Sequence, residues 1–283
     1  MSAALALISA LAYGASDFVA GVMTKRASVL LVTVIGQSTA AAATFVALAF
    51  DSAAISTDAV LWGPLAGIGS MVGTVFLYLG LARGRMSLVA PLSAVFTAVG
   101  SALMGVVLGD RLTVLEIAGI ASACAAIALV SSVPSAGTVG SSATVRSMAY
   151  SLGAGAGFAL LFVALHRAGS ASGLWPVAFT QSTSAFLAAV GTGVALAGGR
   201  LHLRSAKLVW PGALAAGVLG AIATITYFLA TQRGLLSITA VIASLYPAAT
   251  VALAVWLIRE RVHRTQQLGL GLAVAAVALL AVR

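Results

Sequence analysis

The sequence predicts an all-α integral membrane protein with ten transmembrane helices, arranged as two inverted five-helix repeats around a central cavity. Three observations lead to this prediction. Of the 283 residues, 61% are hydrophobic and only 7% are charged, whereas soluble proteins carry about 25% charged residues. The apolar residues fall into ten long segments. Short motifs also recur at a constant spacing between the two halves of the chain, as Gly84 and Gly234 do.

Each of the ten apolar segments is long enough to cross a bilayer, which takes about 20 helical residues at about 1.5 Å per residue. None of them alternates polar and apolar residues as the strands of a membrane β-barrel do. The first segment is expected to be retained, because its flanking charges Lys25 and Arg26 follow it rather than precede it. The predicted spans are 3–23, 29–50, 60–82, 86–108, 113–132, 147–166, 174–197, 208–231, 235–258 and 265–282.

The repeat is visible where the fourth span of each half ends. The motif 108–111 reads Leu-Gly-Asp-Arg and 258–261 reads Ile-Arg-Glu-Arg, so an acid followed by arginine recurs at an offset of 150 residues. Gln37-Ser38-Thr39 is repeated as Gln181-Ser182-Thr183. We therefore predict a first repeat at 1–132, a linker at 133–146 and a second repeat at 147–283. Because five helices are an odd number, the second repeat enters the membrane from the opposite face.

The charged residues exclude several classes of function. The net charge of +9 lies at the ends of the spans, where it indicates topology signals and headgroup anchors rather than nucleic-acid binding. The three histidines fall at span ends or in loops, and the one cysteine, Cys124, has no partner for a disulfide. Neither a metal ligand set nor a nucleophile-base-acid grouping is predicted, so we expect no cofactor and no enzyme.

Polar side chains inside the spans mark the interior of the bundle, because a polar group in lipid costs free energy unless it faces protein or water. Asp17 is the only acid well inside a predicted span. It is interpreted as a proton-titrating or amine-binding carboxylate, or else as an acid near enough to its helix end to reach water or to pair with Lys25. Hydroxyls, amides and phenols spaced three and four residues apart form polar faces on several spans. The candidate cavity residues are Tyr13, Asp17, Gln37, Ser70, Thr74, Tyr78, Ser93, Thr97, Gln181, Thr224, Tyr227, Ser244 and Tyr246. For each hydroxyl, a hydrogen bond to its own backbone or to a neighbouring helix is the alternative.

Two other features suggest conformational roles. Pro91 and Pro247 interrupt the fourth and ninth spans and are candidate hinges, with a static kink as the alternative. Asp110 and Glu260 lie in short turns, where an acid caps the N-terminus of the following helix; a gating ion pair is the alternative.

The two repeated motifs resemble the EamA domains of the drug/metabolite transporter superfamily over essentially the whole chain. They are Gly109-Asp110-Arg111-Leu112-Thr113 and Arg259-Glu260-Arg261-Val262-His263, preceded by Gly80-Leu81-Ala82-Arg83-Gly84 and Ala230-Thr231-Gln232-Arg233-Gly234. The resemblance implies a ten-helix basket with pseudo-twofold symmetry and a cavity lined mainly by helices 1, 3, 4, 6, 8 and 9. It also implies alternating access for small metabolites and a multi-pass place in a bacterial-type inner membrane.

We therefore expect a secondary active transporter that exports amino acids or similar small polar metabolites, with proton coupling through Asp17 left open. A channel or lipid translocator, and a membrane-embedded enzyme, are the alternatives. The expected partners are a small-molecule substrate and the lipid bilayer, without nucleic acid, and the oligomeric state is left open. Eleven Lys and Arg follow odd-numbered spans against four elsewhere, which places both termini outside the cytoplasm; the resemblance places them inside.

Overall fold

A computed structural model describes residues 1–83, 86–130, 141–199, 206–250, 253 and 264–281. Every regular element within these ranges is a helix, which confirms the predicted all-α class for this part of the chain. The helices are α1 (Ser2–Thr24), α2 (Val29–Leu48), α3 (Thr57–Arg83), α4 (Met86–Val107), α5 (Val114–Val130), α6 (Ser141–Arg167), α7 (Trp175–Ala197), α8 (Ala206–Thr231), α9 (Leu236–Ala243) and α11 (Arg264–Ala281).

The helices have the apolar composition of a protein that spans a membrane several times. Five stretches within the described residues are long and apolar enough to cross a bilayer: Ser2–Thr24, Val29–Leu48, Thr57–Gly80, Ser147–Arg167 and Val209–Thr231. Shorter apolar helices accompany them. Outward side chains are apolar as well, since Leu11, Val46 and Phe186 are 54%, 65% and 67% exposed. In a bilayer such side chains face lipid, and backbone polar groups are satisfied within each helix.

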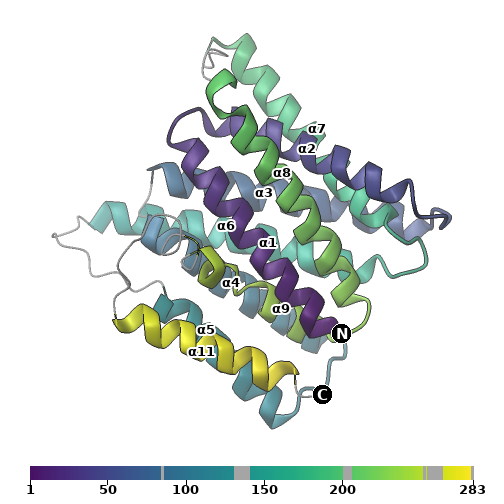
Figure 1. The fold of residues 1–283 in the computed structure, drawn as a ribbon, viewed down its shortest axis with the longest axis vertical. Coiled ribbons are helices and arrows are strands. Elements are labelled where there is room, and N and C mark those ends of the chain that lie inside the picture. The colour runs from purple at the N-terminus through teal and green to yellow at the C-terminus, as the bar shows by residue number, and fades with distance from the viewer. Residues whose placement is uncertain (84–85, 131–140, 200–205, 251–252, 254–263, 282–283) are drawn as a thin grey trace.

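The centre of the bundle consists of two antiparallel helix pairs, α1 with α8 and α3 with α6 (Figure 1). Ser9 Oγ donates to Ala223 O and Ser16 Oγ donates to Ala216 O, both at 2.8 Å, so α1 and α8 run in opposite directions. α2 and α7 cover one side of these pairs, and α4 and α9 cover another. α5 and α11 lie side by side at the edge of the molecule, beyond α4 and α9.

Small residues allow the central helices to approach closely. A methyl group built on Gly157 of α6 would lie 2.8 Å from both Gly69 O and Gly73 Cα of α3. Between membrane helices there is no hydrophobic driving force, so such van der Waals packing of small residues stabilises the pairs.

The chain between α4 and α5 uses two local end structures. Gly109, with a φ of +106°, ends α4, and the Asp110 amide donates to Gly105 O at 2.9 Å in a Schellman arrangement. At the start of α5, the Thr113 amide donates to Glu116 Oε2 at 2.6 Å and the Glu116 amide donates to Thr113 Oγ1 at 3.3 Å. This reciprocal pair is a capping box.

The ninth predicted span, 235–258, is interrupted in the structure. α9 ends at Ala243, residues 244–245 form a turn, and helix resumes at 246–250. Pro247 is the second residue after the turn, and because proline has no amide hydrogen it cannot bond to the Ala243 carbonyl. Pro91, in contrast, lies in the second turn of the continuous helix α4.

The linker predicted at 133–146 overlaps helix, since α6 begins at Ser141. Residues 131–140 lie outside the described residues, as do Glu260 and Arg261 of the second repeated motif. The boundaries of the two predicted repeats therefore stay predictions.

Candidate functional site

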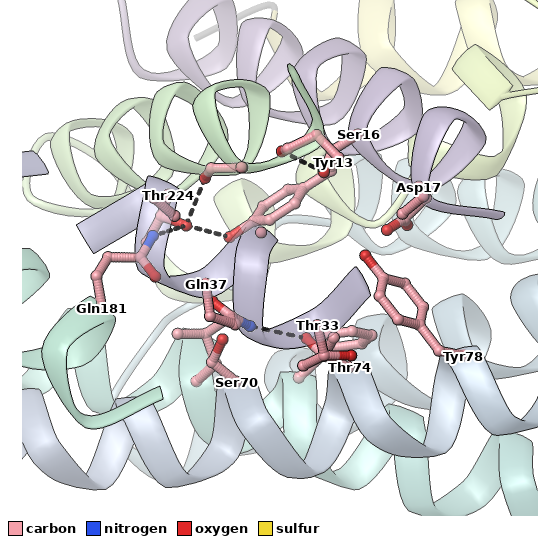
Figure 2. Close-up of a pocket in the computed structure, with 18 of the residues that line it drawn as sticks. Tyr13, Ser16, Asp17, Thr33, Gln37, Ser70, Thr74, Tyr78, Gln181 and Thr224 are labelled. Atoms are coloured by element: carbon pink, nitrogen blue, oxygen red, sulfur yellow. Dashed lines mark hydrogen bonds between the residues drawn. The ribbon is translucent and has the colours of Figure 1, made fainter. Parts of the chain in front are cut away.

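The described residues line a partly open cavity among α1, α2, α3, α6, α7 and α8 (Figure 2). Nine of the predicted cavity residues line it: Tyr13, Asp17, Gln37, Ser70, Thr74, Tyr78, Gln181, Thr224 and Tyr246. α2 and α7 contribute lining residues, whereas the family resemblance implied that helices 4 and 9 would line the cavity. None of the described side chains of α4 lines the cavity, and the ninth predicted span contributes Tyr246 beyond the end of α9.

α1 supplies the acidic wall of the cavity. Tyr13, Ser16, Asp17 and Ala20 line it, and their spacing of three and four residues places them on one face of the helix. The opposite face of α1 carries Leu11, which is 54% exposed. In Figure 2 the hydroxyl of Tyr78, from α3, points toward the Asp17 carboxylate.

A hydroxyl-amide cluster lies at the other side of the cavity, centred on Thr224 of α8. The hydroxyls of Tyr13 and Thr224 are hydrogen-bonded at 3.1 Å, and Gln181 Nε2 donates to Thr224 Oγ1 at 3.3 Å. Thr224 Oγ1 in turn donates to Gly220 O at 2.9 Å. The cluster therefore ties α1, α7 and α8 together at the cavity.

α2 and α3 form a further polar wall. Gln37 Nε2 donates to Thr74 Oγ1 at 3.3 Å, with Ser70 one turn earlier on α3. Thr33 lies one turn before Gln37 and is only 2% exposed, yet its hydroxyl has no hydrogen-bond partner. A buried hydroxyl without a partner costs about 1–3 kcal/mol, which marks this wall as a place where a ligand group would be favoured.

The wall supplied by α6 is apolar and was not predicted. Phe158, Leu161 and Phe162 line the cavity, and the Phe162 ring stacks on Tyr227 with centroids 4.0 Å apart. The spacing of polar residues could not predict these three, because in a helix that is apolar on all sides the sequence does not distinguish apolar side chains that face the cavity from those that face lipid. Only their packing against α3 and α8 distinguishes them from lipid-facing ones.

Four predicted cavity residues lie elsewhere. The Ser93 hydroxyl is 3.0 Å from the Tyr246 hydroxyl, and Thr97 Oγ1 donates to Ser93 O at 2.8 Å. Ser244 Oγ donates to Ala240 O at 2.7 Å within its own chain segment. Tyr227 is fully buried, and its hydroxyl donates to Phe162 O at 3.2 Å. Thr97 and Ser244 therefore donate to the backbone of their own segment, which was the alternative to lining the cavity.

The candidate hinge Pro247 also lies outside the cavity lining. Pro247 directly follows Tyr246, so the break before it adjoins a lining residue. Nothing in the structure tests whether either proline acts as a hinge, and both stay predictions.

The two termini lie at the same end of the bundle (Figure 1), and the cavity-lining residues lie away from that end. The lining residues on α1 and α3 come from the half of each helix remote from that end. At that end, hydrogen bonds join the two halves of the chain. The Leu174 amide donates to Asp51 Oδ2 at 2.7 Å, the Ser56 amide to Ser172 Oγ at 2.7 Å, and Trp175 Nε1 to Ala53 O at 3.0 Å.

One family model matches the second half of the chain. Residues 145–282 match the model of the EamA-like transporter family. A crystal structure of another protein overlays on the chain with a TM-score of 0.77 at 17% identity, covering 98% of this chain and 96% of that chain. At this identity the similarity concerns the fold alone. No curated protein matches the chain.

Proposed function

Because residues 145–282 make this chain a member of the EamA-like transporter family, within the drug/metabolite transporter superfamily, we propose that it is a secondary active transporter. It carries a small metabolite across the bilayer by alternating access. The observation that supports this most is the cavity that contains Asp17, which lies among helices from both halves of the chain. Members of the family are transporters and not enzymes, and nothing in the described residues indicates catalysis.

Two inverted repeats of five spans are part of the proposal, and repeated contacts support them. Gln37 contacts Thr74 between α2 and α3, and Gln181 contacts Thr224 between α7 and α8, both at 3.3 Å. The offsets are 181 − 37 = 144 and 224 − 74 = 150, the same offsets at which the sequence motifs recur. Each glutamine thus has a counterpart that makes the same contact in the other half.

A second pair of contacts has the same offsets. A methyl group on Gly67 of α3 would lie 2.6 Å from Thr183 Cβ of α7, and one on Gly217 of α8 would lie 2.6 Å from Thr39 Cβ of α2. Since 217 − 67 = 150 and 183 − 39 = 144, Gly217 is the counterpart of Gly67 and Thr183 is the counterpart of Thr39. The proposed symmetry therefore converts each contact into the other. Inverted halves of this kind provide two nearly equivalent states, open to opposite faces.

Proton coupling through Asp17 is also proposed, because a carboxylate inside a membrane span is the group that a proton gradient can act on. The test uses purified protein in proteoliposomes, with uptake of labelled amino acids and amines measured with and without a pH gradient. Asp17→Asn is expected to abolish the response to the gradient. Asp58→Asn, a matched change at an exposed acid on the first turn of α3, is expected to keep it.

The outcomes separate the candidate functions. Gradient-driven transport that survives in Asp17→Asn would exclude Asp17 as the coupling group. Ion conductance that does not saturate with substrate would indicate a channel in place of a carrier.

A further inference from the structure

The charge balance of the cavity is one-sided. Asp17 is the only charged side chain among the described residues that line it, and none of these residues is Lys, Arg or His. A buried charge is stable only when it is paired or hydrogen-bonded. A cationic group on a ligand would therefore find a partner here, whereas a carboxylate or phosphate would find no opposite charge and would lie near a like one.

Two helices contribute linings of different character to the cavity. α1 presents Tyr13, Ser16 and Asp17, and α6 presents Phe158, Leu161 and Phe162. A ligand that satisfies both walls has a polar, cationic end and an apolar body. Aromatic faces also attract cations and pack against rings.

Thr33 adds an independent sign that the cavity holds a ligand. Two buried hydroxyls among the described residues, those of Thr33 and Ser101, have no hydrogen-bond partner. Only Thr33 lines the cavity. Thr33 is therefore the described residue at the cavity whose buried hydroxyl lacks a hydrogen-bond partner.

We propose that the cavity binds a primary amine carried on an aromatic or branched apolar body that has no carboxylate. The ammonium group binds the Asp17 carboxylate, the apolar body packs on Phe158 and Phe162, and the Thr33 hydroxyl makes a hydrogen bond to the ligand. This substrate class rests on the proposed transport function and narrows it, because the amino acids expected from the sequence each carry a carboxylate.

The test measures binding to the purified full chain in detergent by thermal stabilisation, since a ligand of the folded state raises Tm according to its Kd. The probes are matched pairs of amine and amino acid: phenethylamine with phenylalanine, tyramine with tyrosine, and isoamylamine with leucine. We expect at least one amine to bind about 10- to 100-fold more tightly than its partner, because the carboxylate of the amino acid would be desolvated near Asp17 without an opposite charge.

Two variants connect the binding to named groups. Asp17→Asn is expected to remove the preference for the amine, while Asp58→Asn keeps it. Thr33→Val removes the unpartnered hydroxyl at nearly constant volume, so the ligand-free protein should be as stable or more stable while the amine binds about 2- to 10-fold more weakly. Ser101→Ala, the matched change outside the cavity, should leave amine affinity unchanged.

The inference is overturned if every amino acid binds as tightly as its amine, or if no amine stabilises the protein. It is also overturned if Asp17→Asn keeps the preference. Counterflow in proteoliposomes distinguishes these results from a failure of the proposed function: transport of amino acids alone refutes the amine class and leaves the carrier. Amine binding without any transport refutes the carrier and leaves the site.

Discussion

The carboxylate of Asp110, in the turn after α4, accepts two hydrogen bonds from Ser237 in the first turn of α9, from the amide at 2.9 Å and from the hydroxyl at 2.6 Å. An acid at this place was expected to cap the following helix, α5. That expectation is wrong for Asp110, because the Thr113–Glu116 capping box already satisfies the start of α5. Asp110 instead joins the first half of the chain to the second.

Removing this contact is predicted to destabilise the protein. Asp110→Ala leaves the buried Ser237 amide and hydroxyl without the carboxylate, at a cost of about 1–2 kcal/mol, typical of a lost N-cap. The measurement is the thermal unfolding of purified protein. Ser237→Ala should be destabilising too, and the double variant should lose less stability than the sum of the two single variants; strict additivity would show that the residues do not interact.

The close approach of α3 and α6 predicts a strong effect of size at Gly157. Gly157→Val places methyl groups against Gly69 and Gly73, and overpacking of this kind costs about 1–3 kcal/mol. Gly193→Ala on α7 is the control, because a methyl group there meets nothing within 4 Å. Expression and Tm in detergent distinguish the two, and equal stabilities would contradict the packing described for α3 and α6.

The repeated glutamine contacts predict equal roles for Gln37 and Gln181. Replacing either by leucine removes a donor to a cavity threonine and should raise the KM for transport by about 2- to 10-fold, as for one neutral hydrogen bond. Uptake at varied substrate concentration provides the measurement. A large effect of one variant and none of the other would argue against equivalent contributions from the two halves.

Two tyrosines that the sequence treats alike are predicted to differ. The Tyr13 hydroxyl belongs to the cavity cluster with Thr224, whereas the Tyr227 hydroxyl donates to Phe162 O outside the lining. Tyr13→Phe should therefore raise KM. Tyr227→Phe should leave KM unchanged and lower stability by about 0.5–1.5 kcal/mol. A raised KM in Tyr227→Phe would place its hydroxyl in the transport path after all.

The hydrophobic segments, the spacing of polar residues and the repeated motifs were enough to predict a helical membrane protein and most of the polar residues that line its cavity. This succeeds because in lipid a polar side chain such as Gln181 or Thr224 must point inward, so composition alone orients each helix. The same polar residues make a membrane span harder to identify from length and composition. α7 has 23 residues, but the polar run that begins at Gln181 lowers its apolar character, and α7 is not among the five stretches named above.

The neighbours of each residue were decided by the tertiary structure alone. Packing between helices that are far apart in the chain decides these contacts. It determines that Ser244 bonds to Ala240 and that Asp110 caps α9. It also determines that Phe158 lines the cavity while Phe186 is exposed. Periodicity specifies a face of one helix, and it contains no information about the partner. The sequence by itself determined which groups seek an interior, and the packing of the two halves determined which of them meet there.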